Sequence, residues 1–271
     1  MDWTPLIVAV APNGASKTKT DHPALPIAAE ELGQTAASCL EAGAAMIHLH
    51  VRRPGGGHTL DPDAYKEGIA AIRRAVGDEI VIQVTSESGG IYRPAEQMQA
   101  IREVKPEAVS LALRELIPDE SHETAAAEYF CWLSANGCVP QYILYNGREV
   151  DRYRELLARG VIPDTPHWVL FVLGRYTGGR QSQPTDLLPF LGQTPECPWS
   201  MCAFGPGEHA CSVTAAALGG HVRVGFENNL HLKDGSIAAD NAALIAQARQ
   251  AAGTLNRPLM NADGLRNLFA S

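Results

Sequence analysis

An eightfold alternation of two kinds of segment constrains the fold of this chain more than any other feature. Short apolar runs rich in β-branched residues alternate with longer amphipathic segments, as in βα units that build a parallel sheet. The predicted strands lie at 5–11, 44–50, 79–85, 107–113, 139–145, 167–173, 199–204 and 221–226. The predicted helices lie near 28–43, 62–77, 94–104, 122–136, 148–160, 183–192, 208–218 and 238–253.

Eight such pairs within 271 residues predict an α/β fold of the (β/α)₈ type, a TIM barrel. An open doubly wound sheet fits less well, because no GxGxxG or GxxxxGK[ST] follows the first strand. The alternation resumes after the Gly- and Pro-rich stretches 53–63 and 174–184, so we interpret both as loops after strands rather than linkers. We therefore expect a single barrel domain over 1–271.

Charge and composition exclude several classes of partner. The chain has 22 Lys and Arg against 30 Asp and Glu, a formal charge of -8, and no basic block, so we expect no nucleic-acid binding. No apolar run approaches the roughly 20 residues of a membrane span, and the start MDWTPLIVAVAPNG does not resemble a signal peptide. The six cysteines form no CxxC, which favours reduced thiols and a cytoplasmic protein.

Two histidines close the second predicted strand. His48 and His50 are two residues apart, so in a strand they point to the same side, here the interior of the barrel mouth. Two imidazoles there are suited to a divalent metal ion. The alternative is a pair of hydrogen-bonded interior histidines without a metal.

The last predicted strand offers a third ligand. Its alternation places Arg223 and Glu227 on one face, with Glu227 at the strand's C-terminal end, two strands from His48 and His50 in a closed barrel. Two histidines and a glutamate form a catalytic zinc ligand set with an open position. A rim salt bridge is the alternative for Glu227, and Arg223 either binds an anion or forms a structural ion pair.

Further polar side chains end other strands. Each of them either belongs to the active site or only forms hydrogen bonds to the backbone as a helix-cap or turn residue. They are Asn13, Ser16, Thr85, Ser86, Glu87, Ser110, Arg114 and Glu115.

Five blocks of the sequence together resemble the β-keto acid cleavage enzymes. They span nearly the whole chain and keep their order. The most specific are the HLHVR and GGHxRxGFE patterns. The blocks are GASKTKTDHPALP (14–26), EAGAAMIHLHVR (41–52), VIQVTSESGG (81–90), LFVLGRYTGG (170–179) and GGHVRVGFENN (219–229).

The resemblance implies a TIM barrel, usually a homotetramer, with zinc held by His48, His50 and Glu227. It implies that a β-keto acid and acetyl-CoA exchange to give acetoacetate and a new acyl-CoA. Thr85 and Ser110 match polar positions of the family and are expected to bind substrate.

Three departures from the family pattern change the expected substrate and base. Ser16 stands where the type member has a glutamate that recognises the substrate's amino group, so we expect a non-amino substrate. Asn228 replaces an aspartate that pairs with the arginine in a catalytic dyad, and an amide is not a general base. The segment ALRELIPDE (112–120) replaces a small turn and introduces Arg114 and Glu115.

We interpret these changes together. Glu115, or alternatively Glu87, supplies the missing base, and Arg114 favours an anionic or neutral polar substrate tail. Arg175 and Arg180 are candidates to bind the CoA phosphates. Two other functions stay open: a metal-dependent retro-aldolase or hydrolase without acetyl-CoA, and a catalytically impaired protein that binds keto acids.

Overall fold

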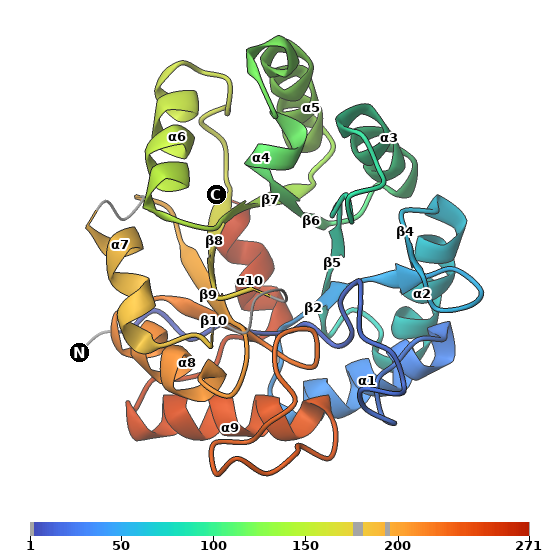
Figure 1. The fold of residues 1–271 in the computed structure, drawn as a ribbon, viewed down its shortest axis with the longest axis vertical. Helices are drawn as coiled ribbons and strands as arrows, with labels where there is room; N and C mark the ends of the chain where they lie inside the picture. The colour runs from blue at the N-terminus through green and yellow to red at the C-terminus, as the bar shows by residue number, and fades with distance from the viewer. Residues whose placement is uncertain (1–2, 176–180, 193–195, 271) are drawn as a thin grey trace.

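Eight parallel strands close into a barrel with helices around it (Figure 1). This computed structural model describes residues 3–175, 181–192 and 196–270. Around the barrel the strands follow the order β1-β10-β9-β8-β7-β6-β5-β2, which confirms the predicted TIM barrel. Their bounds are β1 (Val8–Val10), β2 (Met46–Leu49), β5 (Val81–Thr85), β6 (Ala108–Ala112), β7 (Val139–Leu144), β8 (Trp168–Leu173), β9 (Trp199–Ala203) and β10 (His221–Val224).

The outer helices lie within about three residues of their predicted bounds. The segment predicted as one helix over 183–192 is instead a 3₁₀ turn, η2 (Pro184–Leu187), followed by the short helix α7 (Leu188–Leu191). Pro189 lies within the first turn of α7 and lacks the N–H that would join the two. The others are α1 (Ala29–Ala42), α2 (Pro62–Val76), α3 (Pro94–Val104), α5 (Glu123–Ala135), α6 (Gly147–Ala158), α8 (Glu208–Ala217) and α9 (Asn241–Thr254).

Several short elements were not predicted. The stretch 53–63, interpreted as a loop after the second strand, contains β4 (His58–Thr59), which pairs antiparallel with β3 (Val51–Arg52) to form a hairpin. Its turn has Gly55 and Gly56 at φ of 93° and 86°, a conformation that glycine adopts without strain. The remaining elements are α4 (Leu113–Leu116), η1 (Glu120–His122) and α10 (Ala262–Phe269).

The two ends of the barrel differ in chemistry. At the N-terminal end of the strands, α10 packs Leu265 against a buried apolar group that includes Met46 and Trp168. At the C-terminal end, polar residues such as His50, Thr85 and Glu227 lie at or shortly after the ends of β2, β5 and β10. Because parallel strands present their C-terminal ends on one side, side chains from distant parts of the sequence meet there.

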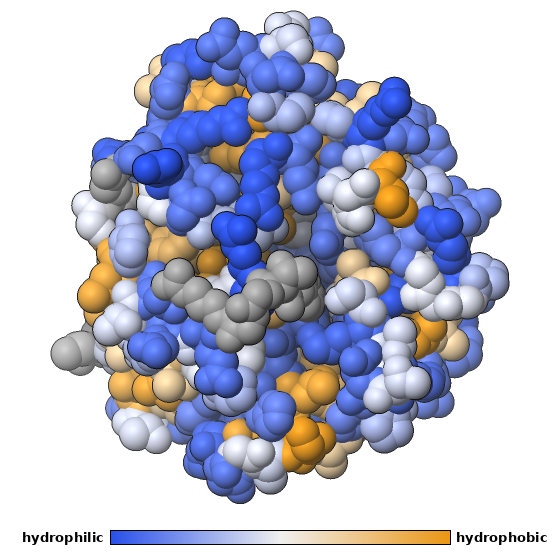
Figure 2. Space-filling model, in the orientation of Figure 1, coloured by the Kyte–Doolittle hydropathy of each residue, from blue (hydrophilic) through white to orange (hydrophobic). Residues whose placement is uncertain are grey.

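The surface seen in Figure 2 is mainly hydrophilic, with hydrophobic residues in small separated groups. Such a distribution is ordinary for a surface that faces water. Within the described residues, no helix combines the length and the apolar character needed to cross a membrane.

Candidate active site

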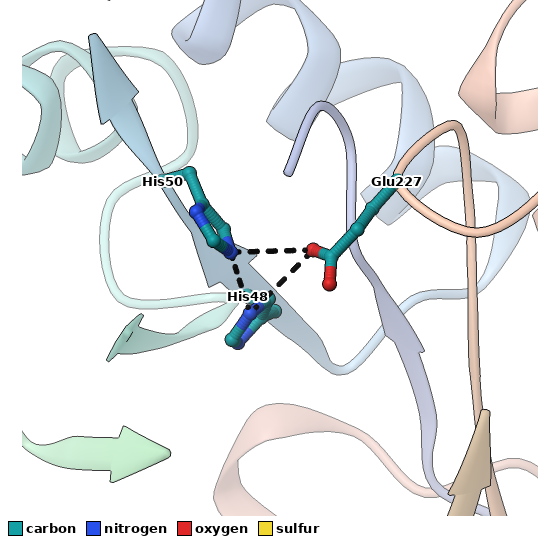
Figure 3. A group of neighbouring side chains, drawn as sticks. All are labelled: His48, His50 and Glu227. Atoms are coloured by element: carbon teal, nitrogen blue, oxygen red, sulfur yellow. Dashed lines mark hydrogen bonds and ion pairs between the residues drawn. The ribbon is translucent and has the colours of Figure 1, made fainter. Parts of the chain in front are cut away.

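His48, His50 and Glu227 come together at the C-terminal end of the barrel (Figure 3). His48 lies in β2 and His50 follows its last residue, so both imidazoles point to the same side. The distances are 3.1 Å between the two Nε2 atoms, 3.5 Å from His48 Nε2 to Glu227 Oε2, and 3.4 Å from His50 Nε2 to the same oxygen. We call these residues the His–His–Glu cluster.

The spacing of these three donor atoms matches a tetrahedral zinc site. Zinc bonds to nitrogen and oxygen of about 2.0–2.1 Å place tetrahedral ligand atoms roughly 3.3–3.4 Å apart. All three side chains are buried. Oε2 of Glu227 accepts no hydrogen bond from any described residue and faces the two imidazoles. The donor set therefore fits a metal ion with an open fourth position.

The sequence predicted Glu227 at the end of a strand. In the structure it reaches the cluster from the turn that follows β10. β10 finishes at Val224, and Gly225 follows with φ of 139°. A Cβ atom at Gly225 would collide with the backbone of Ala11, so only glycine fits this turn. The turn brings Glu227 back over the residue four positions earlier, Arg223.

Arg223 fixes the orientation and charge of Glu227. Its Nη2 donates to Glu227 Oε1 at 3.1 Å, with both side chains buried. Burial alone would raise the pKa of the Glu227 carboxyl, but Arg223 and the two histidines together hold it well below its usual value. Burial and the nearby Arg223 charge hold the pKa of His48 well below its usual value. An ionised carboxylate and a neutral imidazole are the states that bind a metal ion.

A glutamine sets the tautomer of His48. Oε1 of Gln83 accepts from Nδ1 of His48 at 2.8 Å, while Nε2 of Gln83 donates to Gln141 Oε1 at 3.1 Å. Because the amide oxygen only accepts, the proton of the neutral imidazole is assigned to Nδ1. The lone pair of Nε2 is then left for the cluster, as in other metal-binding histidines.

A cavity of about 290 Å³ opens beside the cluster. Of the residues expected from the sequence to act on substrate, Thr85, Arg114 and Glu115 line it, and so does the exposed Arg175. Arg175 also borders an adjoining cavity of about 480 Å³. Arg180 lies outside the described residues.

Three other predicted residues do not line this cavity. Ser16 is exposed in the loop after β1. Ser110 is buried in β6, and its Oγ has no hydrogen-bond partner in the described part of the chain. Asn228 is buried next to Glu227, and neither atom of its side-chain amide is hydrogen-bonded to a described residue.

Glu115 and Arg114 are both held by neighbouring groups. Oε2 of Glu115 accepts from the backbone N–H of Ser88 at 2.9 Å and from Nε2 of Gln97 at 3.0 Å. The guanidinium carbon of Arg114 lies 3.4 Å from the centre of the Tyr145 ring. Nη1 of Arg114 is 3.8 Å from Glu149 Oε1.

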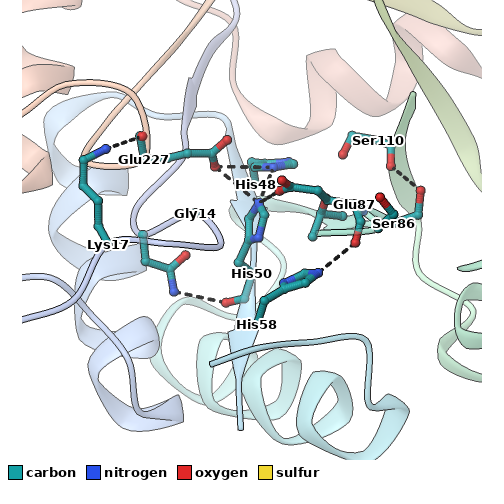
Figure 4. Close-up of polar contacts among 12 residues, drawn as sticks. Gly14, Lys17, His48, His50, His58, Ser86, Glu87, Ser110 and Glu227 are labelled. Carbon is teal, nitrogen blue, oxygen red and sulfur yellow. Dashed lines mark hydrogen bonds and ion pairs between the residues drawn. The ribbon is translucent and has the colours of Figure 1, made fainter. Parts of the chain in front are cut away.

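Glu87, unlike Glu115, lies within ion-pair distance of the His–His–Glu cluster. Its Oε2 is 3.8 Å from Nε2 of His50, and its side chain lines the cavity (Figure 4). Burial raises the pKa of its carboxyl. The imidazole of His58, from the unpredicted hairpin, bonds the Glu87 carbonyl oxygen at 2.7 Å. The sequence analysis named Glu87 as the alternative base, because it comes just after a predicted strand.

Lys17 is a site residue that the sequence analysis did not identify. Its Nζ donates to the backbone oxygen of Glu227 at 2.6 Å (Figure 4). The loop that carries it is fixed by Arg52, which donates to the carbonyl oxygen of Gly14 at 2.9 Å and to that of Lys17 at 3.0 Å. The arginine of the HLHVR block therefore positions the loop after β1.

Glu208 was also missed, because nothing local in the sequence marks it. It begins α8 and is fully enclosed. Its two oxygens accept from the N–H of Gly225 at 3.3 Å and from Nδ2 of Asn229 at 3.1 Å. Burial raises the pKa of Glu208 to about 8. The two contacts fix both ends of the turn that carries Glu227.

Comparison with protein families finds one match over nearly the whole chain. A family model described as beta-keto acid cleavage enzyme matches residues 5–270. The chain is 31% identical over 270 residues to the 3-keto-5-aminohexanoate cleavage enzyme of Acetoanaerobium sticklandii, covering 97% of each protein. It is 26% identical over 277 residues to the 3-oxoadipate:acetyl-CoA acetyltransferase of Cupriavidus necator, covering 98% of this chain and 94% of that protein.

Among solved structures, the fold is similar to that of ObcA in a ternary complex with a C4-CoA adduct and oxalate. The TM-score is 0.72 at 16% sequence identity, covering 92% of this chain and 68% of ObcA. At this identity the likeness concerns the fold alone.

Proposed function

The chain belongs to the β-keto acid cleavage enzyme family and is an acyltransferase that breaks a carbon–carbon bond, and we propose that it does so with zinc held by the His–His–Glu cluster. The proposed reaction converts a β-keto acid and acetyl-CoA into acetoacetate and a new acyl-CoA. The observation that supports the zinc most directly is the tetrahedral spacing of three buried donor atoms beside a cavity.

When bound, zinc would act as a Lewis acid toward the keto and carboxylate oxygens of the substrate. The protein's own side chains would prepare that site. Arg223 keeps Glu227 ionised and turned toward the histidines, and Gln83 holds His48 in the tautomer that leaves Nε2 free. The Thr85 hydroxyl lines the cavity and is placed to contact the substrate.

We assign proton abstraction to Glu87. The acidic C–H of a β-keto acid is the methylene between its keto and carboxylate groups, which lies next to any atoms held at the cluster. Glu87 is 3.8 Å from His50 and its raised pKa makes it a stronger base than an ordinary carboxylate. Glu115 is engaged by Ser88 and Gln97, and we assign it to positioning the loop that carries Glu87. Asn228 cannot accept this proton, because an amide is not basic.

The atoms of the reaction balance without a further reactant. Removal of the methylene proton lets that carbon attack the acetyl thioester, which expels the CoA thiolate. The thiolate then attacks the original keto carbon, and cleavage of its bond to the methylene carbon releases the new acyl-CoA. The proton returns to that carbon, which leaves as part of acetoacetate.

The substrate that we propose carries no amino group. Ser16 is exposed and uncharged where the resemblance expects an acidic partner for an amine, and it does not line the cavity. For the cosubstrate, Arg175 borders both the active-site cavity and the adjoining one, which favours an approach of the CoA phosphates there. Arg180 remains a candidate for the same phosphates on sequence grounds.

The remaining proposals concern the whole molecule. The family likeness supports a homotetramer in which each chain acts as one barrel domain. All six cysteines are unpaired, which fits the reducing cytoplasm. Light scattering after gel filtration tests the tetramer.

The function is tested with zinc-loaded protein, acetyl-CoA and a panel of β-keto acids, with CoA esters identified by mass. We expect a new acyl-CoA in equal amount to acetoacetate, and about one zinc per chain by elemental analysis. Product formed at the same rate without acetyl-CoA would instead indicate a retro-aldolase or hydrolase. Keto acid binding without any product would indicate an impaired enzyme.

Two histidine variants provide the matched control. His50→Asn removes a donor from the cluster and is expected to lose both zinc and activity. His122→Asn changes a half-buried histidine on the outer η1 turn, whose partners among the described residues are Asp119 and Ser121, and should retain both.

A further inference from the structure

The cavity beside the His–His–Glu cluster has two walls of different chemistry. One wall is polar and comes from β2, β5, the loop after β5 and the end of β10. The opposite wall comes from β6, β7, β8 and the residue after β9, and it is apolar. The apolar wall consists of Ala112, Ile143, Val172 and Phe204.

Strand register builds this apolar wall. Ala112 of β6 pairs with Ile143 of β7, and Ile143 pairs with Leu170 of β8. Val172, two residues after Leu170, points to the same side of β8 and pairs with Cys202 of β9, so these side chains gather inside the barrel. With Leu170 they form a hydrophobic group separate from the larger core between strands and helices. No wall residue is more than 8% exposed.

Tyr145 packs against the apolar wall, and Arg114, which also lines the cavity, lies over the Tyr145 ring. Burial raises the pKa of the Tyr145 phenol, which is therefore neutral. The charge of Arg114 is directed at the Tyr145 ring and at Glu149, 3.8 Å away. The carboxylates that line the cavity nearby, Glu87 and Glu115, would repel a second carboxylate. Because Arg114 is engaged by these neighbouring groups, we no longer expect it to select an anionic substrate tail.

We propose that the apolar wall receives the side chain of the β-keto acid, and that the substrate has a short, uncharged hydrocarbon tail. This inference rests on the proposed function, because the keto acid head must lie at the His–His–Glu cluster for its tail to cross the cavity. A charged tail against these four apolar side chains would lose water, at a large cost, because none of the four offers a charge or a hydrogen bond. Each methylene that fits such a pocket changes kcat/KM by about 10-fold or more.

The test compares two keto acids that differ only at the end of the tail. 3-Oxohexanoate ends in a methyl group where 3-oxoadipate ends in a carboxylate. We expect kcat/KM with acetyl-CoA to be about 100-fold higher for 3-oxohexanoate, and the thermal midpoint of the zinc-loaded protein to rise more with it. The ratio of two substrates on one enzyme sample is independent of how much of the sample is folded.

Matched threonine variants of β8 locate the selectivity. Val172→Thr places a hydroxyl on the apolar wall and should lower the preference for 3-oxohexanoate by about 10-fold. Val169→Thr makes the same change on the side of β8 that faces the helices and should leave the ratio unchanged. Ala112→Ser is a milder second variant of the wall, with an effect in the same direction.

Equal or faster turnover of 3-oxoadipate would overturn the inference while leaving the proposed function intact. A Val172→Thr effect on the KM for acetyl-CoA, with unchanged keto acid selectivity, would also overturn it and assign the wall to the cosubstrate. If neither these two nor any other β-keto acid of the panel gives a CoA ester, the proposed function fails. The thermal shifts then still decide which tail the wall prefers.

Discussion

Nη2 of Arg223 lies 3.1 Å from Oε1 of Glu227 and leaves the other carboxylate oxygen to the histidines. One oxygen therefore sets the charge and rotation of the side chain, while Oε2 stands 3.4–3.5 Å from two imidazole nitrogens. The two residues are four positions apart, on either side of the Gly225 turn.

Loss of this contact should weaken metal binding. We expect Arg223→Gln to lower zinc affinity by about 10- to 100-fold, the usual effect of removing a group that orients a metal ligand. Competition with a chromogenic chelator measures it. Arg257→Gln is the control, because that buried arginine donates to the backbone oxygens of Ala216 and Gly220 and makes no hydrogen bond to the His–His–Glu cluster within the described residues. Unchanged affinity in Arg223→Gln would contradict the assigned role.

Gln83→Leu should also reduce zinc affinity, by about 10-fold or more, because Nδ1 of His48 would lose its acceptor and the tautomer would no longer be fixed. Gln83→Glu keeps an acceptor at that position and should restore most of the affinity. Equal losses in both variants would indicate a packing role for Gln83 instead.

Glu87 and Glu115, the two carboxylates of the cavity outside the His–His–Glu cluster, should differ in their effect on kcat. Glu87→Gln is expected to reduce kcat by about 10²-fold or more, as loss of a general base does, with zinc content unchanged. Glu115→Gln keeps an acceptor for Ser88 and Gln97 and should cost less than about 10-fold. The reverse order would return the role of base to Glu115.

The burial of Glu208 predicts a pH-dependent stability. Its pKa is raised from 4.5 to about 8 on folding, so below about pH 4.5 both states hold the proton. Between pH 4.5 and about 8 only the folded state keeps the Glu208 proton. The free energy of unfolding of the wild type, relative to Glu208→Gln, should therefore fall as pH rises, by at most about 1.4 kcal/mol per pH unit. Urea unfolding at several pH values measures this difference.

Glu107 supplies a control of opposite sign. Burial alone would raise the pKa of Glu107, but hydrogen bonds from Arg266 and from the Ile82 N–H lower it overall. The wild type should therefore gain stability over Glu107→Gln as pH rises through the acidic range, and lose that advantage as pH falls. The same slope in both variants would contradict the assignment for Glu208.

The sequence predicted the barrel because each strand and helix carries its own local periodicity. It also predicted that His48 and His50 share a side, since two residues in a strand are related by simple alternation. The hairpin at 51–59 and the helix at 262–269 were missed, because they are too short to establish a period. Pairing of a two-residue strand depends on the glycine turn between the strands rather than on hydrophobic pattern.

Contacts between distant segments could not be predicted in the same way. Gln83 and His48 are partners only because β5 pairs with β2 in a register that places them side by side. Glu208 would be an ordinary first-turn acid of a helix if the turn after β10 did not enclose it. Arg114 looked like a substrate contact until its positions relative to Tyr145 and Glu149 were known.

The His–His–Glu cluster spans the place where the barrel closes. β1 lies between β2, which carries His48, and β10, which precedes Glu227, and Val8 pairs with Val222 where these first and last strands meet. The three donors therefore meet only while β1 joins β2 to β10. An ion bound there would favour the joined sheet over every partly open form, and metal loading should slow hydrogen exchange at the amides of β1.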